Sequence, residues 1–368
     1  MKRILAIALC LIMALAIVAC GTPAEQTTEA PKNDTTEAPE TPATEAEYKL
    51  GMGIVVKTDS SKTGLAQVDA TVATVVTDAN GKIVACRIDV AQNKYDLTKD
   101  FATEAAKTFE TKMELGDRYN MAGKVDNDND GVKLEWDAQA KAFEKHVVGM
   151  TVDQVAAMRT QLAGGHYITT DADLLNAGCS MQITDFIQAV VKACDDRNAV
   201  AFKANPKKMT LGVAAITTVD GATKAATAEA DGSVNMYTDF ACAVVVKGKV
   251  VATLNDAIQP KFAINANGEI VSATFAGTKR ELRYAYNMEK FGSDNDGDER
   301  VLEWYLQSAA FSSYVMSNKM TADKIDNMET TLVNNHYIST DSELISAGCT
   351  MQITGICDVV AKAARNAR

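Results

Sequence analysis

Two short segments of the chain carry residues that could hold a phosphate group. They are nearly identical, reading AGCSMQIT at 177–184 and AGCTMQIT at 347–354. In each segment a glycine, Gly178 or Gly348, stands two residues before a hydroxyl, Ser180 or Thr350. Glycine lets a ligand approach the backbone, and the free N–H groups of the apolar helix expected to follow favour an anion. We therefore take these four residues as candidate cofactor-binding residues; the alternative is that the hydroxyls are only N-caps.

The cysteines and histidines near these segments are weaker candidates. Cys179 and Cys349 repeat between the segments, and each is either a reactive thiol at a helix start or a small buried hydrophobe. His166 and His336 also repeat, but neither has a second histidine nearby, so a loop hydrogen bond is expected rather than a metal site. No C-x-x-C, Ser-His-Asp or Gly-x-Ser-x-Gly pattern occurs, so the sequence predicts no zinc site, disulfide framework or catalytic residue.

An acidic segment resembles a calcium-binding loop. Asp126, Asp128, Asp130, Gly131 and Asp137 nearly match positions 1, 3, 5, 6 and 12 of an EF-hand loop. Position 12 carries Asp in place of Glu, and the flanking pattern falls short of a helix-loop-helix. The first three aspartates are therefore calcium candidates, with a solvated acidic loop as the alternative. A similar alternation occurs later in the chain, at Asp294, Asp296 and Asp298.

The chain contains the same pattern twice. Tyr119-Asn120-Met121 recurs as Tyr286-Asn287-Met288, and Glu135-Trp136 recurs as Glu303-Trp304. Repeats in one order and at a nearly constant spacing indicate an internal duplication. We expect one copy at 48–200 and another at 207–368, each folding around its own core. The two glutamates are either functional carboxylates or residues favoured in the first turn of a helix.

Each copy is expected to begin with an antiparallel hairpin. The Val- and Thr-rich run 68–77 and the run 82–90 flank Asn80-Gly81, which supplies the positive φ angles of a tight turn. In the second copy the turn falls at Lys247-Gly248-Lys249. Hairpins followed by helices predict an α+β protein, in which two tandem copies each pack an antiparallel β hairpin or sheet with helices.

Three segments follow the hairpin in the first copy. A helix beginning at Trp136 has apolar residues on one face. A second helix begins at Thr151 with a capping-box pattern and is expected to end at Gly164-Gly165. Residues 166–176 are expected to form a loop, which leads into the signature and a last apolar helix.

The hairpin, the Glu-Trp helix and the terminal signature together resemble bacterial membrane-anchored lipoproteins with tandem FMN-binding-like domains, the "major membrane immunogen" type. That family attaches FMN to a threonine hydroxyl through a phosphoester. Gly178-Cys179-Ser180 and Gly348-Cys349-Thr350 occupy the matching places. The resemblance implies FMN as a cofactor, and a flavin transferase and a membrane quinone oxidoreductase as partners.

The N-terminus has the features of a lipoprotein export signal. A basic start, Lys2-Arg3, precedes an apolar run that is too short to span a bilayer comfortably. The run ends in Val18-Ala19-Cys20-Gly21, which resembles a lipobox. We predict a signal peptide at 1–19 and lipidation of Cys20; the alternative is an ordinary secretory signal with a chance cysteine. Residues 20–47 are rich in Thr, Glu and Pro and are expected to form a disordered linker.

Composition narrows the function further. The formal charge of −11 would become −13 without Lys2 and Arg3, and no basic cluster offers a nucleic-acid surface. We expect a protein held on the outer, extracytoplasmic face of the cell membrane by lipid on Cys20. Its function is either FMN carriage in extracytoplasmic electron transfer or that of a cofactor-free surface binding or structural lipoprotein. In neither case is it expected to be an enzyme in its own right.

The anchor assignment makes a direct prediction. Replacing Cys20 with Ala removes the acylated thiol, so the variant should leave the membrane fraction and appear in the medium, because acyl chains supply most of the membrane affinity. Fractionation followed by immunoblotting measures this. A variant that stays in the membrane fraction unchanged contradicts the assignment.

Overall fold

The structure is a computed structural model that describes residues 45–124 and 126–368. The expected signal peptide 1–19, Cys20 and the linker up to residue 44 lie outside the described residues. The described residues belong to one compact unit. It is a mixed α+β structure with antiparallel sheets, as the sequence predicts. Among the described helices none is long and apolar enough to cross a membrane.

The first half begins with a three-stranded meander. Its strands are β1 (Ala46–Lys57), β2 (Leu65–Asp78) and β3 (Ile83–Asp96), and β6 (Ala199–Ala204) adds to β1. A small separate hairpin is made of β4 (Thr160–Ala163) and β5 (His166–Thr169). The helices are α1 (Phe101–Ala105), α2 (Lys112–Leu115), η1 (Gly116–Tyr119), α3 (Trp136–His146), α4 (Val152–Ala156), α5 (Ala172–Asn176), α6 (Thr184–Ala193) and η2 (Asp196–Asn198).

The second half repeats the meander, the helices and the separate hairpin in that order, and it adds β10 and β11 after β9. Its strands are β7 (Met209–Val219), β8 (Gly232–Val246), β9 (Lys249–Ile258), β10 (Lys261–Ile264) and β11 (Ile270–Thr274), with a separate hairpin of β12 (Thr330–Val333) and β13 (His336–Ser339). The helices are α7 (Lys279–Leu282), η3 (Arg283–Tyr286), α8 (Met288–Phe291), α9 (Trp304–Ser317), α10 (Ala322–Asp326), α11 (Ser342–Ser346) and α12 (Thr354–Arg365).

Both predicted hairpin turns are confirmed in position, although in the first turn only Gly81, and not Asn80, has a positive φ. Gly81 has φ of +73° between β2 and β3, and Lys247 and Gly248 have φ of +51° and +73° between β8 and β9. Positive φ at these positions suits the right-handed twist of the flanking strands. The turns therefore fix the register of each meander.

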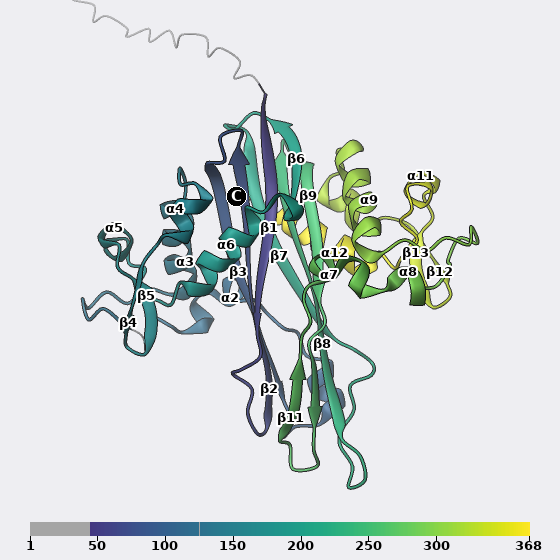
Figure 1. Cartoon of the computed structure of the whole chain (residues 1–368), viewed down its shortest axis with the longest axis horizontal. Helices are drawn as coiled ribbons and strands as arrows, with labels where there is room; N and C mark the ends of the chain where they lie inside the picture. Colours follow the sequence, from purple (N-terminus) through teal and green to yellow (C-terminus); the bar gives the residue numbers. More distant parts are fainter. Residues whose placement is uncertain (1–44, 125) are drawn as a thin grey trace, which may run out of the picture. The chain divides into compact units, whose positions relative to one another are not determined.

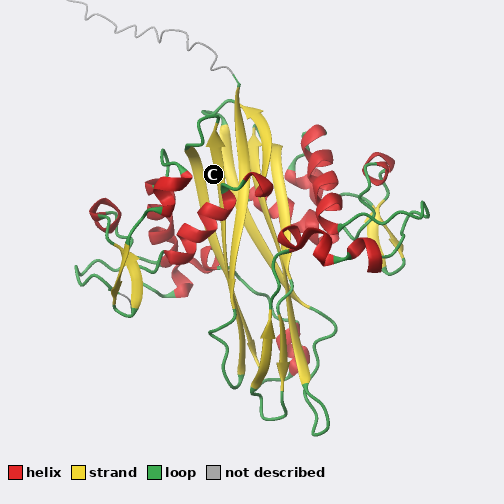
Figure 2. Ribbon diagram, in the orientation of Figure 1, coloured by secondary structure: helices red, strands yellow, loops and turns green. Residues whose placement is uncertain are grey.

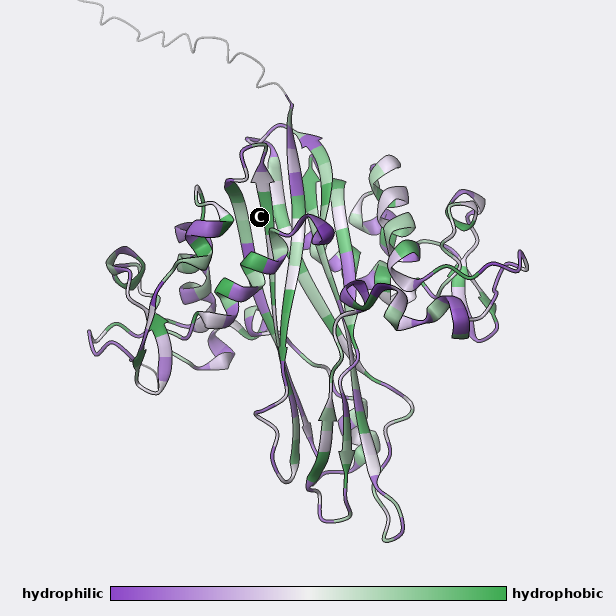
Figure 3. Cartoon of the chain, viewed as in Figure 1, coloured by the Kyte–Doolittle hydropathy of each residue, from purple (hydrophilic) through white to green (hydrophobic). Residues whose placement is uncertain are grey.

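Each main sheet is apolar on both faces, and the two faces meet different partners. The inner faces pack on each other in one core that includes Leu50 and Met52 of β1 and Met236 and Phe240 of β8. The outer face of the first sheet packs against α3 and α6, and that of the second against α9 and α12. The helices thus flank the strands on both sides (Figures 1 and 2), and hydrophobic residues concentrate along the strands (Figure 3).

Equivalent contacts recur at the junction of the halves. Lys192 of α6 forms an ion pair of 2.7 Å with Glu281 of α7, and Lys362 of α12 forms one of 2.6 Å with Glu114 of α2. In the first pair the first half supplies the lysine, and in the second pair the second half supplies it. Such reciprocal contacts between equivalent residues are typical of a two-fold arrangement.

A close approach between strand and helix also recurs. A Cβ added to Gly51 of β1 would lie 1.8 Å from the carbonyl oxygen of Ala193, and one added to Gly212 of β7 would lie 2.0 Å from that of Ala363. Glycine is therefore required where the last helix of each half crosses the first strand. Together with the strand pairings, these contacts define which residues of the two halves are equivalent.

Two predicted elements of the first half are wrong. The helix that begins at Thr151 is only α4, and the chain then forms the β4–β5 hairpin, which turns at Gly164-Gly165 with φ of +56° and +84°. The segment 166–176, expected to be a loop, contains β5 and α5. The two glycines mark a tight turn rather than a helix end, because Ala163 pairs with His166 across them.

The division into domains at 48–200 and 207–368 stays a prediction, and the shared inner core leads us to expect cooperative unfolding. The chain has two tryptophans, Trp136 and Trp304, one in each half. In the single-tryptophan variants Trp304→Phe and Trp136→Phe, denaturant titration followed by fluorescence should give the same midpoint. Phe240→Ala opens a cavity in the shared core, so it should lower both midpoints. The expected loss of unfolding free energy is about 3–5 kcal/mol.

The exposed Phe291 provides the control, because Phe291→Ala should change stability by no more than about 0.5 kcal/mol. Two well-separated transitions, with Phe240→Ala moving only the one reported by Trp304, would show instead that the halves fold independently.

Candidate functional site

Each half encloses a cavity lined by equivalent residues. The first-half cavity has a volume of about 630 Å³ and the second-half cavity about 840 Å³, both in the range of small-molecule sites. The shared lining of the first-half cavity is Gln92, Lys112, Tyr119, Trp136, His166 and Met181. The matching residues of the second are Gln259, Lys279, Tyr286, Trp304, His336 and Met351. The sequence alone did not show these cavities, because their walls come from segments far apart in the chain.

A lysine packed on aromatic rings lies at the base of each cavity. The ammonium of Lys112 lies 4.8 Å from the ring centre of Tyr119 and 5.7 Å from that of Trp136. The ammonium of Lys279 lies 4.8 Å from the ring centre of Tyr286 and 5.2 Å from that of Trp304. Each geometry allows a cation–π attraction. We call the lysine, tyrosine and tryptophan of each half the aromatic floor.

A buried aspartate supports the short helix that carries each lysine. Asp89 of β3 accepts a hydrogen bond from the backbone N–H of Met113 at 3.1 Å, and Asp256 of β9 accepts one from that of Arg280 at 3.0 Å. Burial raises the pKa of each aspartate to about 6, with hydrogen bonds acting in the opposite direction. These carboxylates position the lysines and lie outside both cavity linings.

Glu135 and Glu303 position the aromatic residues. They are the N-cap residues of α3 and α9, directly before the two tryptophans. The carboxylate of Glu135 accepts the backbone N–H of Met121 at 2.8 Å, and that of Glu303 accepts the N–H of Met288 at 3.0 Å. Each glutamate therefore ties the Tyr-Asn-Met segment to the start of the tryptophan helix.

A glutamine clamp holds each signature segment. Oε1 of Gln139 accepts the N–H groups of Ser180 at 3.0 Å and Met181 at 2.9 Å. In the second half, Oε1 of Gln307 accepts those of Thr350 at 2.9 Å and Met351 at 2.7 Å. These glutamines repeat in the sequence, yet only the structure shows that their side chains hold the backbone just before the methionine of each cavity.

The candidate residues of the signature lie beside the cavities rather than in them. Ser180 and Thr350 are 3% and 4% exposed, and neither lines a cavity. The N-cap interpretation is also wrong, because Ile183 and Ile353 occupy the N-cap positions of α6 and α12. The helices begin four residues after the hydroxyls, so the free N–H groups at the helix start are not adjacent to them.

Gly178 and Gly348 are explained by the backbone. Their φ angles are +84° and +91°, and each follows a short helix, as expected at a C-terminal helix turn. A Cβ at Gly178 would lie 2.4 Å from Cδ1 of Leu134, and one at Gly348 would lie 2.5 Å from Cδ1 of Leu302. Neither glycine lines a cavity, so neither is placed to contact a ligand there.

The cysteines and the histidines lie in different environments. Cys179 and Cys349 are fully buried, and burial raises the pKa of each thiol to about 12, so both act as small hydrophobes. His166 and His336 each line a cavity. Within the described residues, the side-chain groups suited to a metal ion contain only aspartates.

Those aspartates are the acidic segments found in the sequence. Carboxylate oxygens of Asp126, Asp128 and Asp130 lie within 4.8 Å of one another, as do those of Asp294, Asp296 and Asp298. The Oδ1 atoms of Asp126 and Asp128 are buried and have no hydrogen-bond partner. Asp137, expected at position 12 of a calcium loop, lies outside the group and pairs with Lys141 at 2.6 Å.

The acidic segments also contact the signature. Nδ2 of Asn127 donates to the carbonyl oxygen of Ser180 at 2.9 Å, and Nδ2 of Asn295 donates to that of Thr350 at 2.8 Å. Each acidic segment is thus fixed to the backbone that leads into the cavity wall.

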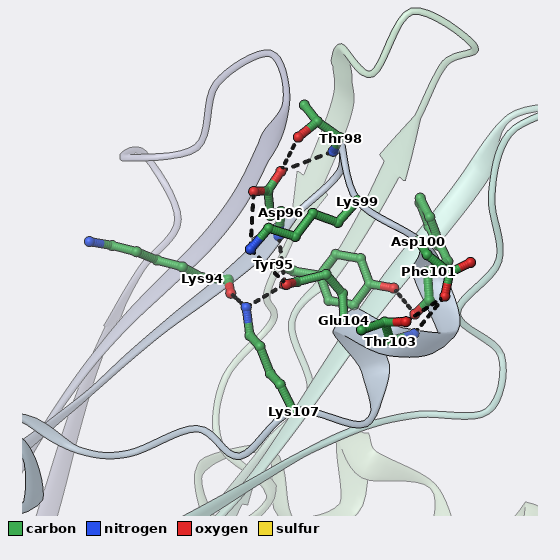
Figure 4. Close-up of polar contacts among 10 residues, drawn as sticks. All are labelled: Lys94, Tyr95, Asp96, Thr98, Lys99, Asp100, Phe101, Thr103, Glu104 and Lys107. Atoms are coloured by element: carbon green, nitrogen blue, oxygen red, sulfur yellow. Dashed lines mark hydrogen bonds and ion pairs between the residues drawn. The ribbon is translucent and has the colours of Figure 1, made fainter.

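A further network holds the end of β3, which brings Gln92 and Lys94 to the first-half cavity. The buried carboxylate of Glu104 accepts the backbone N–H of Asp96 at 3.1 Å and pairs with Lys107 (Figure 4). The hydroxyl of Tyr95 donates to the carbonyl oxygen of Phe101 at 2.7 Å. These contacts fasten α1 against the strand beside the cavity.

No protein-family model matches the chain, and no curated protein or solved structure is significantly similar to it.

Proposed function

We propose that this protein is a cell-surface lipoprotein in which two copies of one module, tethered through lipid on Cys20, bind small molecules in the two cavities. The observation that carries the proposal is the aromatic floor, which occurs with the same lysine, tyrosine and tryptophan in both halves. A concave site with aromatic walls and a few convergent polar groups is the usual form of a small-molecule site.

FMN is the candidate ligand of the first-half cavity. Tyr119 and Trp136 line this cavity as aromatic residues, and Lys94, Lys112 and Lys124 line it as partners for a phosphate. The bound flavin would supply the redox chemistry, while the protein would bind and orient it. The lipid anchor would keep such a carrier beside a membrane quinone oxidoreductase.

Reversible binding is the form that the side chains favour. A phosphoester on Ser180 or Thr350 requires a hydroxyl open to the ligand, and both residues are buried outside the cavity linings. We therefore propose FMN carriage without covalent attachment, which needs no flavin transferase. The alternative is a cofactor-free binding lipoprotein, in which the cavities take another ligand.

Fluorescence of Trp136 tests FMN binding. In the Trp304→Phe variant of the full chain, FMN should quench the remaining tryptophan with a saturable curve. Lys112→Met should weaken binding by about ten-fold or more, because it removes a cation from the floor. Lys279→Met, its equivalent in the other half, is the matched control and should leave the curve unchanged. A titration with no saturable quenching would favour the cofactor-free alternative.

Calcium is the candidate ligand of the acidic segments, and the partnerless oxygens of Asp126 and Asp128 fit a hard cation. Calcium should raise the melting temperature progressively, since it would bind only the folded chain. Combining Asp128→Asn with Asp296→Asn should remove the effect, whereas Asp153→Asn on the exposed face of α4 should preserve it. An unchanged melting temperature at millimolar calcium would leave the segments as solvated loops.

A further inference from the structure

The two cavities share a floor but differ in the charges around it. Four lysines and three aspartates line the first-half cavity, whereas one lysine and three aspartates line the second. In the first, Lys57 and Asp185 neutralise each other in an ion pair of 2.6 Å. The lining of the first-half cavity therefore has a net positive formal charge, and that of the second-half cavity has a net negative one.

The difference arises at equivalent positions. The register of the first strands places Thr218 where the first half has Lys57, and the pairing of the second strands places Asp239 where it has Thr71. On the last helices, Asp358 stands at the position of Gln188 in the same alignment of the signatures. Each change makes the second-half cavity more acidic.

A glycine gives Asp239 room beside the last helix. Gly355 of α12 stands where α6 carries Asp185, and a Cβ there would lie 2.8 Å from Oδ2 of Asp239. The loss of one side chain thus accommodates the carboxylate gained on β8. Both residues line the second-half cavity, as does Asp358.

The single lysine of this lining is already engaged. Lys279 is 7% exposed. Besides packing over the aromatic floor, its ammonium lies 4.8 Å from the ring centre of Tyr237 and donates a hydrogen bond to the Tyr237 hydroxyl at 3.1 Å. Burial lowers the pKa of its ammonium to about 8, and the carboxylates of Asp239 and Asp256 oppose that shift. One ammonium therefore faces more carboxylates than it can neutralise.

The carboxylates themselves reflect this imbalance. Burial raises the pKa of Asp239 to about 7, Lys279 opposes the shift, and repulsion from Asp256 and Asp358 adds to it. Burial also raises the pKa of Asp358. A second positive group in the cavity would favour the ionised form of both aspartates, so its binding gains from their charge.

We propose that the second-half cavity binds an organic cation, with an ammonium group facing Asp239 and Asp358 and an apolar part against Tyr286 and Phe291. Both aromatic side chains line the cavity, and Phe291 is 74% exposed, so its ring is open to a ligand. Aromatic faces and carboxylates together are the groups that recognise alkylammonium ions. The inference rests on the proposed role of the cavities as ligand sites, and it divides the two halves between ligands of opposite charge.

Fluorescence of Trp304 tests the inference. In the Trp136→Phe variant of the full chain, phenyltrimethylammonium should quench the remaining tryptophan with a saturable curve. Benzenesulfonate, an anion with the same ring, should bind about ten-fold more weakly or worse, because the lining repels it. Equal affinity for the two probes, or no binding of either, would overturn the proposal.

Substitutions taken from the other half provide matched variants. Asp239→Thr and Asp358→Gln install the residues of the first half, and together they should reduce the affinity for phenyltrimethylammonium by about ten-fold or more. Asp358→Gln alone, at an exposed position of α12, should give part of this loss even if Asp239→Thr impairs folding. Unchanged affinity in Asp358→Gln with an intact melting curve would contradict the proposed contact.

Failure here is distinct from failure of FMN binding. The FMN titration reports on Trp136 and the first-half cavity, whereas the cation titration reports on Trp304 and the second. Binding of FMN without selectivity for a cation would leave the proposed function standing and reject only the division of charge.

Discussion

The packing of the two main sheets through their inner faces is the constraint on which the rest of the structure depends. Residues of β1, β2, β7 and β8 share one apolar core, so each sheet needs the other half to cover one face and its own helices to cover the other. Burial of this core supplies the dominant favourable free energy of association between the halves. Residues of the outer helices and loops then line each cavity together with residues of the strands of its own half.

Each cavity is built by backbone contacts that repeat between the halves while the surrounding charges vary. Glu135 and Glu303 fix the aromatic segments, and Gln139 and Gln307 fix the signature. These side chains accept hydrogen bonds from backbone N–H groups. They therefore hold the aromatic floor in place without constraining which other side chains line the cavity. Under the proposed function, such a scaffold would allow the cavity of one half to change its ligand while the other keeps its own.

The sequence predicts what local chemistry determines. Gly81 and Gly248 adopt the positive φ that glycine accepts without strain, so both hairpin turns follow from the sequence, as does the capping box at Thr151. The β4–β5 hairpin was missed because Gly164-Gly165 can end a helix or turn a hairpin, and only tertiary contacts decide between them. The N-cap assignment of Ser180 failed because the helix begins at Thr184, after an irregular turn held by Gln139.

The cavities lie beyond sequence reasoning for a different reason. Lys112, Trp136 and His166 are far apart in the chain and meet only after the sheet and helices have packed. The repeated Tyr-Asn-Met and Glu-Trp motifs, the repeated histidines and the methionine of each signature mark the cavities in advance. Their repetition is visible in the sequence. That the tyrosine and tryptophan line a cavity and that the glutamate holds them in place is visible only in the structure.

The central claim, that ligands bind on the aromatic floor rather than at the signature hydroxyls, is tested most directly by ¹⁹F NMR. The two tryptophans of the unaltered chain would be replaced biosynthetically by 5-fluorotryptophan, and the signals assigned with Trp136→Phe and Trp304→Phe. Addition of FMN should shift the Trp136 signal and leave the Trp304 signal in place. Binding of FMN, shown by its own fluorescence, without movement of the Trp136 signal would contradict the account.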